Sequence, residues 1–151
     1  MSSLNEMESM FLALADKTRL RLLNLMANGE VCVALFTEIL GVSQPKISRH
    51  LAYLRNAHLV DVRREGKWMH YSVRWPDDEG RRAVLQTTLN ALADVPGLLQ
   101  DRARLTTDPF PTENGHRNIA LTERQTQEME SFETLPPVSS PRHNELEEFL
   151  L

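Results

Sequence analysis

The stretch LGVSQPKISRHLAYLRNAHLV, residues 40–60, decides the fold of this chain. Gly41 is typical of a residue that ends a helix. Ser43 is typical of one that begins the next helix, with Pro45 in the first turn, where its missing N–H is harmless. Three apolar residues then recur at helical spacing: Ile47, Leu51 and Leu54. The stretch therefore predicts two helices joined by a tight turn, which is a helix-turn-helix.

The flanking segments predict further helices upstream and a hairpin downstream. Residues 4–15 and 17–27 carry apolar side chains at helical spacing, and Asp16 between them suits an N-cap. Residues 59–65 and 67–73 are rich in β-branched and aromatic side chains and flank a glycine, which favours a β-hairpin.

Two more helices complete the pattern. The apolar stretch 31–40 predicts the helix before the tight turn, and a final helix is expected from Asp77 to about Leu92, with a break at Pro96. The order is then four helices, a hairpin and a helix. This order predicts a mainly α fold with a β-hairpin wing, which is a winged helix-turn-helix.

Charge divides the chain of 151 residues into two parts. Residues 1–105 carry 14 Lys+Arg and 12 Asp+Glu, a net charge of +2, whereas residues 106–151 carry 3 and 9, a net charge of −6. Five of the eight prolines also lie in the second part. We therefore predict one folded domain over 1–105 and an acidic, Pro/Ser-rich, disordered tail over 106–151, with a short helix near 120–132 as an alternative for part of it.

The helix that begins near Ser43 has an outward face suited to a DNA groove. Arg49 suits bidentate pairing with guanine, and Lys46 suits a backbone phosphate. The residues of this helix that we expect to meet DNA are Gln44, Lys46, Ser48, Arg49 and Tyr53. A solvated amphipathic helix without a DNA partner has the same periodicity, so the helix alone leaves both interpretations open.

The predicted hairpin places three cations near its tip: Arg63, Arg64 and Lys67. Cations at a wing tip suit backbone phosphates or the minor groove. A charged, exposed edge that resists aggregation is the alternative interpretation.

Three segments together resemble the ArsR/SmtB family of winged helix-turn-helix repressors: LADKTRLRLL, LGVSQPKISRHLAYLRNAHLV and RREGKWMHYSV. The resemblance covers roughly residues 5–95. It implies a homodimeric repressor that binds double-stranded DNA and that an effector releases from its operator. A two-fold dimer would read a pseudo-palindromic operator with half-sites about 34–36 Å apart.

In that family the first and last helices form the dimer interface. The corresponding apolar residues of this chain are Met7, Phe11, Leu14, Leu85, Leu89 and Leu92. Each stripe would serve equally well to cover the chain's own core, so the pattern alone leaves the homodimer open.

The effector site of the family is incomplete in this chain. Members that sense arsenite carry CVC at this point, often with a third Cys, whereas this chain has Cys32, Ala34 and Thr37. Trivalent arsenic prefers two or three thiolates, which Ala and Thr cannot replace. Cys32 thus remains open as a packed residue, a reactive thiol, or a ligand to a trivalent metalloid or soft metal with partners of another type.

A second family site uses Asp, His and Glu on the last helix to bind zinc. The corresponding segment here, residues 77–94, has four acidic residues and no His, so we expect no zinc site. No cofactor is implied with certainty.

Other classes of function are less well supported. No Gly-rich phosphate loop and no nucleophile–base pair has a recognisable spacing, so we predict that the protein is not an enzyme. No apolar run approaches the ~20 residues that span a bilayer, and the cytoplasm is the simplest compartment. The main rival is a winged-helix protein–protein adaptor that uses the acidic tail.

Overall fold

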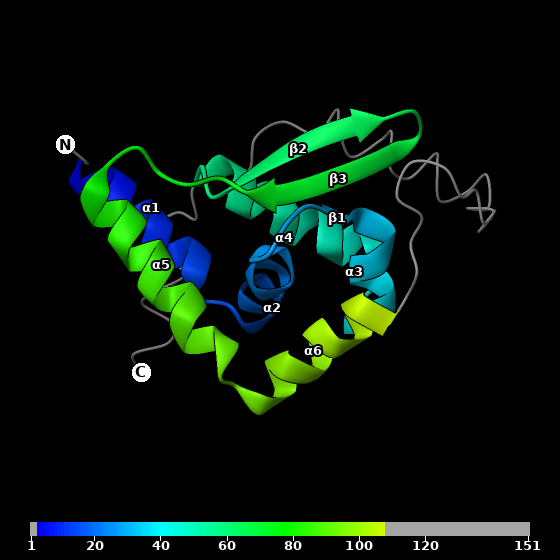
Figure 1. The fold of residues 1–151 in the computed structure, drawn as a ribbon. Coiled ribbons are helices and arrows are strands. Elements are labelled where there is room, and N and C mark those ends of the chain that lie inside the picture. Colours follow the sequence, from blue (N-terminus) through cyan, green and yellow to red (C-terminus); the bar gives the residue numbers. More distant parts are fainter. Residues whose placement is uncertain (1–2, 108–151) are drawn as a thin grey trace, which may run out of the picture.

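The computed structural model describes residues 3–107, which form helices and one small sheet (Figure 1). The elements in chain order are α1 Leu4–Leu14, α2 Lys17–Met26, β1 Val31–Cys32, α3 Val33–Leu40, α4 Gln44–Asn56, β2 Val60–Glu65, β3 Trp68–Val73, α5 Glu79–Ala93 and α6 Pro96–Thr107. The predicted class, a mainly α winged helix-turn-helix, is confirmed. The predicted disorder of the tail and the short helix near 120–132 lie outside the described residues.

Helix starts are encoded locally, as the sequence indicated. The Asp16 carboxylate accepts from the Arg19 backbone N–H at 3.0 Å and caps α2, and the Asp78 carboxylate accepts from the Arg81 N–H at 2.9 Å and caps α5. Each bond satisfies one of the N–H groups that a helix start leaves unpaired. Ser43 is the N-cap residue of α4, although its side chain makes no capping hydrogen bond.

The turn between α3 and α4 depends on glycine. Gly41 has a φ of 62°, in the left-handed region, and its N–H donates to the Thr37 carbonyl at 3.0 Å. A side chain would strain this conformation, whereas glycine adopts it freely. The tight helix-turn-helix angle therefore follows from one residue.

The sheet is antiparallel, with the strand order β1-β3-β2. The hairpin of β2 and β3 turns at Gly66, as predicted. β1 was not predicted, because its residues were assigned only to the apolar stretch 31–40. β1 pairs just two residues with β3, Val31 with Tyr71 and Cys32 with His70. So short a strand has no alternation that a sequence pattern could reveal.

The core is built from residues of α1 to α5 and of the three strands, with α2 in the middle (Figure 1). The predicted inward residues of α4, which are Ile47, Leu51 and Leu54, are fully buried. The wing packs on this core through Phe36 of α3, whose ring centroid lies 6.5 Å from that of Tyr71. α4 is thus held with its opposite face directed outward.

α6 was not predicted. The break near Pro96 is real, but the chain resumes a helix and returns across α2 and α3 (Figure 1). The side chain of Arg21 donates two hydrogen bonds to Asp101, at 2.8 and 2.9 Å. The Asn24 amide donates to the Leu98 carbonyl at 3.1 Å. Polar contacts between distant parts of the chain hold this helix, and helical periodicity does not detect them.

Candidate nucleic-acid interface

The outward face of α4 carries cations without acidic neighbours. Its three cations are Lys46, Arg49 and Arg55, all exposed, and the helix contains no Asp or Glu. None of the three forms an ion pair with another residue of the part that the structure describes, 3–107. The face therefore presents positive charge that is available to an anionic partner.

The other predicted α4 contacts are only partly accessible. Ser48 and Tyr53 are half-buried. The Nε2 atom of Gln44 is covered by protein and has no hydrogen-bond partner among the described residues. A base contact from Gln44 therefore requires its side chain to leave this position, and satisfying the buried amide would favour such a move.

Tyr53 is engaged by Arg19 of α2. The guanidinium carbon of Arg19 lies 4.1 Å from the centroid of the tyrosine ring. Next to it, the His50 Nδ1 atom lies 3.7 Å from an Asp16 carboxylate oxygen. Burial lowers the pKa of His50, against the opposing effect of Asp16. This cluster fixes the side of α4 that faces α2, so the predicted role of Tyr53 as a DNA contact is joined by a structural one.

The three wing cations differ in availability. Arg63 donates to the Glu30 carboxylate, with the shortest bond at 2.6 Å, and to Glu65 at 3.1 Å. Arg64 donates to the Gly66 carbonyl at 3.1 Å. Lys67 is exposed at the turn and makes no ion pair with a described residue. Arg63 therefore joins β2 to Glu30, the residue before β1, whereas the charge of Lys67 forms no ion pair among the described residues.

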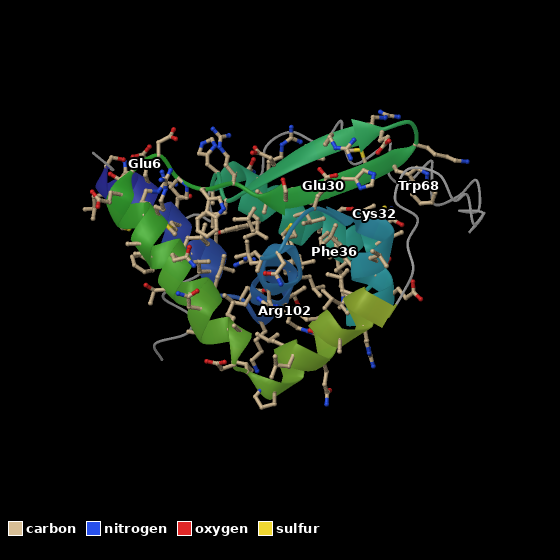
Figure 2. All side chains as sticks on the ribbon, viewed as in Figure 1. Glu6, Glu30, Cys32, Phe36, Trp68 and Arg102 are labelled. Carbon is tan, nitrogen blue, oxygen red and sulfur yellow. The ribbon has the colours of Figure 1, made fainter. Side chains whose placement is uncertain are left out.

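Glu30 connects the wing to the segment before α3. Figure 2 shows Glu30 and Cys32 along this segment, next to β3. The hydrogen bonds from Arg63 lower the pKa of the Glu30 carboxyl. His70 completes the group, with Nδ1 3.8 Å from Glu30 and Nε2 3.6 Å from Glu65. The Glu30–Arg63 pair and the Arg19–Tyr53 contact were missed from the sequence because the two partners of each lie more than 30 residues apart.

Cys32 lies at the junction of β1 and α3. It is the N-cap residue of α3, its side chain is buried, and it makes no capping hydrogen bond. Burial raises the pKa of the thiol, which disfavours the thiolate. The thiol is thus placed as a small apolar residue.

The described residues do not fit a metalloid or zinc site. The Thr37 hydroxyl, at a position where arsenite sensors of the family often carry a thiol, donates to the Ala34 carbonyl at 2.7 Å within α3. Within residues 3–107, no three His, Cys, Asp or Glu side chains are grouped to hold a metal ion. On α5, Asp78 is already used as an N-cap. One thiol is fewer than the two or three that a trivalent metalloid prefers.

The sequence of the chain matches a known family of proteins. Residues 16–62 match the family described as bacterial regulatory protein, arsR family. An arsenic resistance transcriptional regulator of Pseudomonas putida is 52% identical over 82 residues, which is 54% of this chain and 64% of that protein. A second such regulator of the same organism is 43% identical over 82 residues, or 54% of this chain and 71% of that protein. The chain belongs to the arsR family. It spans less than two thirds of the first relative's length.

A solved structure agrees with the fold of this arsR-family chain. The homodimeric winged helix-turn-helix DNA-binding domain of a possible ArsR-family regulator from Mycobacterium bovis has a TM-score of 0.50 and 28% identity. The match covers 60% of this chain and 81% of the other. That domain, by its description, has the winged helix-turn-helix architecture described above.

The six predicted dimer residues of this arsR-family chain divide into two groups. Leu14, Leu85 and Leu89 are buried in the chain's own core, so they leave almost no surface for a partner. Met7 and Leu92 are half-buried, and Phe11 is 53% exposed. On the same helix as Phe11, Leu4 is 85% exposed. The unburied apolar surface of α1 is therefore centred on Leu4 and Phe11.

No helix within the described residues is long and apolar enough to cross a membrane.

Proposed function

We propose that the protein is a sequence-specific, dimeric DNA-binding transcriptional repressor. The observation that carries the proposal is the exposed, acid-free cationic face of α4, presented by a helix whose opposite side is fully buried. A helix of this kind fits the major groove of B-DNA. Lys67 on the adjacent wing adds a contact that does not depend on sequence. The relatives described as arsenic resistance regulators support the same assignment.

The proposal assigns different roles to Arg49 and Lys67. Arg49 reads a base edge, so Arg49→Ala should weaken binding to a selected operator roughly tenfold or more and leave random DNA much less affected. Lys67 meets a phosphate, so Lys67→Ala should weaken both duplexes alike and reduce the salt slope by about one.

Fluorescence anisotropy with a selected duplex and its shuffled counterpart measures both effects. Arg82→Ala removes the same charge from an exposed position of α5 and serves as the matched control. Equal losses on both duplexes for Arg49→Ala would reject its role as a reader. Weak, sequence-independent retardation by the wild type would favour the adaptor function instead.

The proposed dimer uses α1. Leu4 and Phe11 expose apolar surface that a second copy would cover, and burial of such side chains supplies about 1.5–3 kcal/mol each. Phe11→Glu should convert the dimer to a monomer in sedimentation experiments and weaken binding to the two half-sites of a pseudo-palindromic operator. Glu8→Gln, on the same helix and exposed, is the control that should leave the dimer intact.

The proposed repressor is released from its operator by an effector that modifies Cys32. The support is positional: Cys32 occupies the N-cap position of α3, which precedes α4, and it pairs with His70 of the wing. A group added to a buried thiol overfills a packed site and destabilises the fold by roughly 1–3 kcal/mol. We expect the structure to relieve this overpacking by displacing α3 relative to the wing. We propose a thiol-reactive electrophile rather than a metalloid because the described residues of each copy offer one thiol.

Iodoacetamide tests this step. The Cys32 sulfur would form a bond to carbon, with loss of iodide and the thiol proton. Alkylated wild type should lose operator affinity, whereas Cys32→Ala treated in the same way should keep its own. Equal loss in Cys32→Ala would reject Cys32 as the site. Arsenite and zinc in the same assay test the metal(loid) alternative.

A further inference from the structure

Charge segregation in this chain pairs two of its parts. Residues 108–151 carry nine acidic and three basic side chains, whereas α4 carries three exposed cations and no acid. Lys67 adds a fourth cation on the wing. The acidic segment is therefore negatively charged, like the DNA phosphates, and the cationic face of α4 would attract both.

α6 determines where this segment leaves the fold. The guanidinium of Arg104 donates to the Ile39 carbonyl at 3.0 Å, near the end of α3. Ile39 is two residues before Gly41, which makes the turn into α4. Figure 1 shows the yellow C-terminal end of α6 beside α3. The chain after Thr107 therefore begins next to the helix-turn-helix.

Polar contacts anchor α6 ahead of this exit point. The Asp101 carboxylate is buried and receives both hydrogen bonds from Arg21. Arg102, labelled in Figure 2, donates to the Asn24 carbonyl at 3.2 Å. Together with Arg104, these contacts join α6 to α2 and α3 along its length.

The length of the segment is sufficient. A random coil of 44 residues, the number from 108 to 151, has a mean span of about 35 Å. A 13-residue helix such as α4 is only about 20 Å long. A tethered peptide of this size meets a neighbouring surface at an effective concentration on the order of millimolar.

We propose that the acidic segment 108–151 binds the cationic face of α4 and Lys67 in the absence of DNA and competes with DNA for it. The inference rests on the proposed DNA-binding function. The segment would lower the affinity of the protein for DNA of any sequence. The effect would be largest at low salt, where the attraction between the segment and the cationic face is least screened. Displacement of the segment would then favour specific operators, whose extra contacts to bases the segment cannot mimic.

Contact between segment and face can be measured without DNA. A nitroxide attached at Leu146→Cys in the full chain should broaden the amide signals of Lys46 and Arg49; buried Cys32 reacts far more slowly with the label. The matched control has the same label and every acidic residue of 108–151 replaced by its amide. Signals restored in this control support the proposal. Equal broadening in both proteins, or none in either, overturns it.

DNA titrations supply the functional readout. The amide variant should bind shuffled DNA about tenfold more tightly than wild type at low salt, with a difference that shrinks as salt increases. The opposite change, Arg117→Gln with Arg124→Gln and Arg142→Gln, makes the segment more acidic and should weaken binding. Equal affinities for all three proteins overturn the competition. If none binds DNA, the proposed repressor function fails, and the nitroxide measurement still decides the contact.

Discussion

The guanidinium group of Arg19 lies over the Tyr53 ring, with 4.1 Å between the guanidinium carbon and the ring centroid. The same side chain donates from Nε to the Ala13 carbonyl at 2.7 Å and from Nη2 to the Leu12 carbonyl at 2.9 Å. Arg19 thus binds two carbonyls in the last turn of α1, and its contact with Tyr53 fixes α1 against α4. Arg19 therefore stabilises both the C-terminal end of α1 and the position of α4, the proposed DNA-reading helix.

Arg19→Met should therefore destabilise the fold although Arg19 touches no proposed DNA contact other than Tyr53. Hydrogen bonds to a charged donor contribute about 1.5–3 kcal/mol, and the partial exposure of Arg19 reduces this, so we expect a loss of roughly 2 kcal/mol. Urea unfolding measures it. Lys17→Met, an exposed cation on the same helix, should change stability by less than about 0.5 kcal/mol. Equal effects would remove the special role of Arg19.

The Glu30–Arg63 pair should make stability depend on pH in the acid range. The pKa of Glu30 is lowered from 4.5 by Arg63, so the carboxylate stabilises the fold above that value, and this contribution is lost as pH falls below it. Wild type should lose more stability than Glu30→Gln on acidification, and added salt should reduce the difference because the pair is exposed. Thermal unfolding of both proteins between about pH 3 and 6 is the measurement. Parallel curves would contradict the pair's contribution.

Cys32 should react slowly in the folded protein. Burial raises its pKa above the ordinary 9.0, so the folded chain holds a neutral thiol, and the stability that this form contributes is lost as pH rises beyond that value. Near pH 8, alkylation of native protein should be at least about tenfold slower than alkylation in urea, and destabilising variants such as Arg19→Met should increase the native rate. Native and unfolded rates that agree would show an open, activated thiol instead.

The sequence was sufficient for the parts of the fold that neighbouring residues encode. Gly41 and Ser43 mark the turn, and the apolar residues Ile47, Leu51 and Leu54 identify the buried face of α4, so the helix-turn-helix was predictable. The wing was predictable from the β-branched and aromatic residues on both sides of Gly66. Periodicity identifies an apolar face but not what covers it. Leu85 and Leu89 were therefore candidates for a dimer interface, whereas the chain's own core covers them.

Contacts between residues distant in sequence were not predictable. Glu30 and Arg63 are 33 residues apart, and Arg21 and Asp101 are 80 apart. Nothing in their local patterns indicates these pairs, because each depends on how separate elements pack. The same reason explains why the pairing of Arg63 with Glu30 and the helix α6 were missed, whereas a DNA contact of Arg63 stays a prediction.

His58 should be replaceable by glycine with a gain in stability. It follows the end of α4 with a φ of 59°, and its N–H donates to the Arg55 carbonyl at 2.9 Å. A side chain in this left-handed conformation costs roughly 1–2 kcal/mol, part of which glycine recovers, so His58→Gly should raise Tm by a few degrees. Asn56→Gly, at the last helical residue, should lower it. A lower Tm for His58→Gly would show that the imidazole makes a stabilising contact.

The effects of Arg21 and Asp101 on stability should be strongly coupled, because the Asp101 carboxylate is buried and depends on Arg21 for its counter-charge. The Asp101 side chain is 5% exposed, against 36% for Arg21. Arg21→Met would leave a buried carboxylate without its guanidinium and should cost roughly 2 kcal/mol or more, whereas the double change with Asp101→Leu removes the unpaired charge and should cost less than the sum of the two single changes. A double-mutant cycle in urea measures this coupling. Additive losses would mean that the Arg21–Asp101 pair does not anchor α6, which the hydrogen bonds at Leu98, Arg102 and Arg104 and apolar packing would then hold.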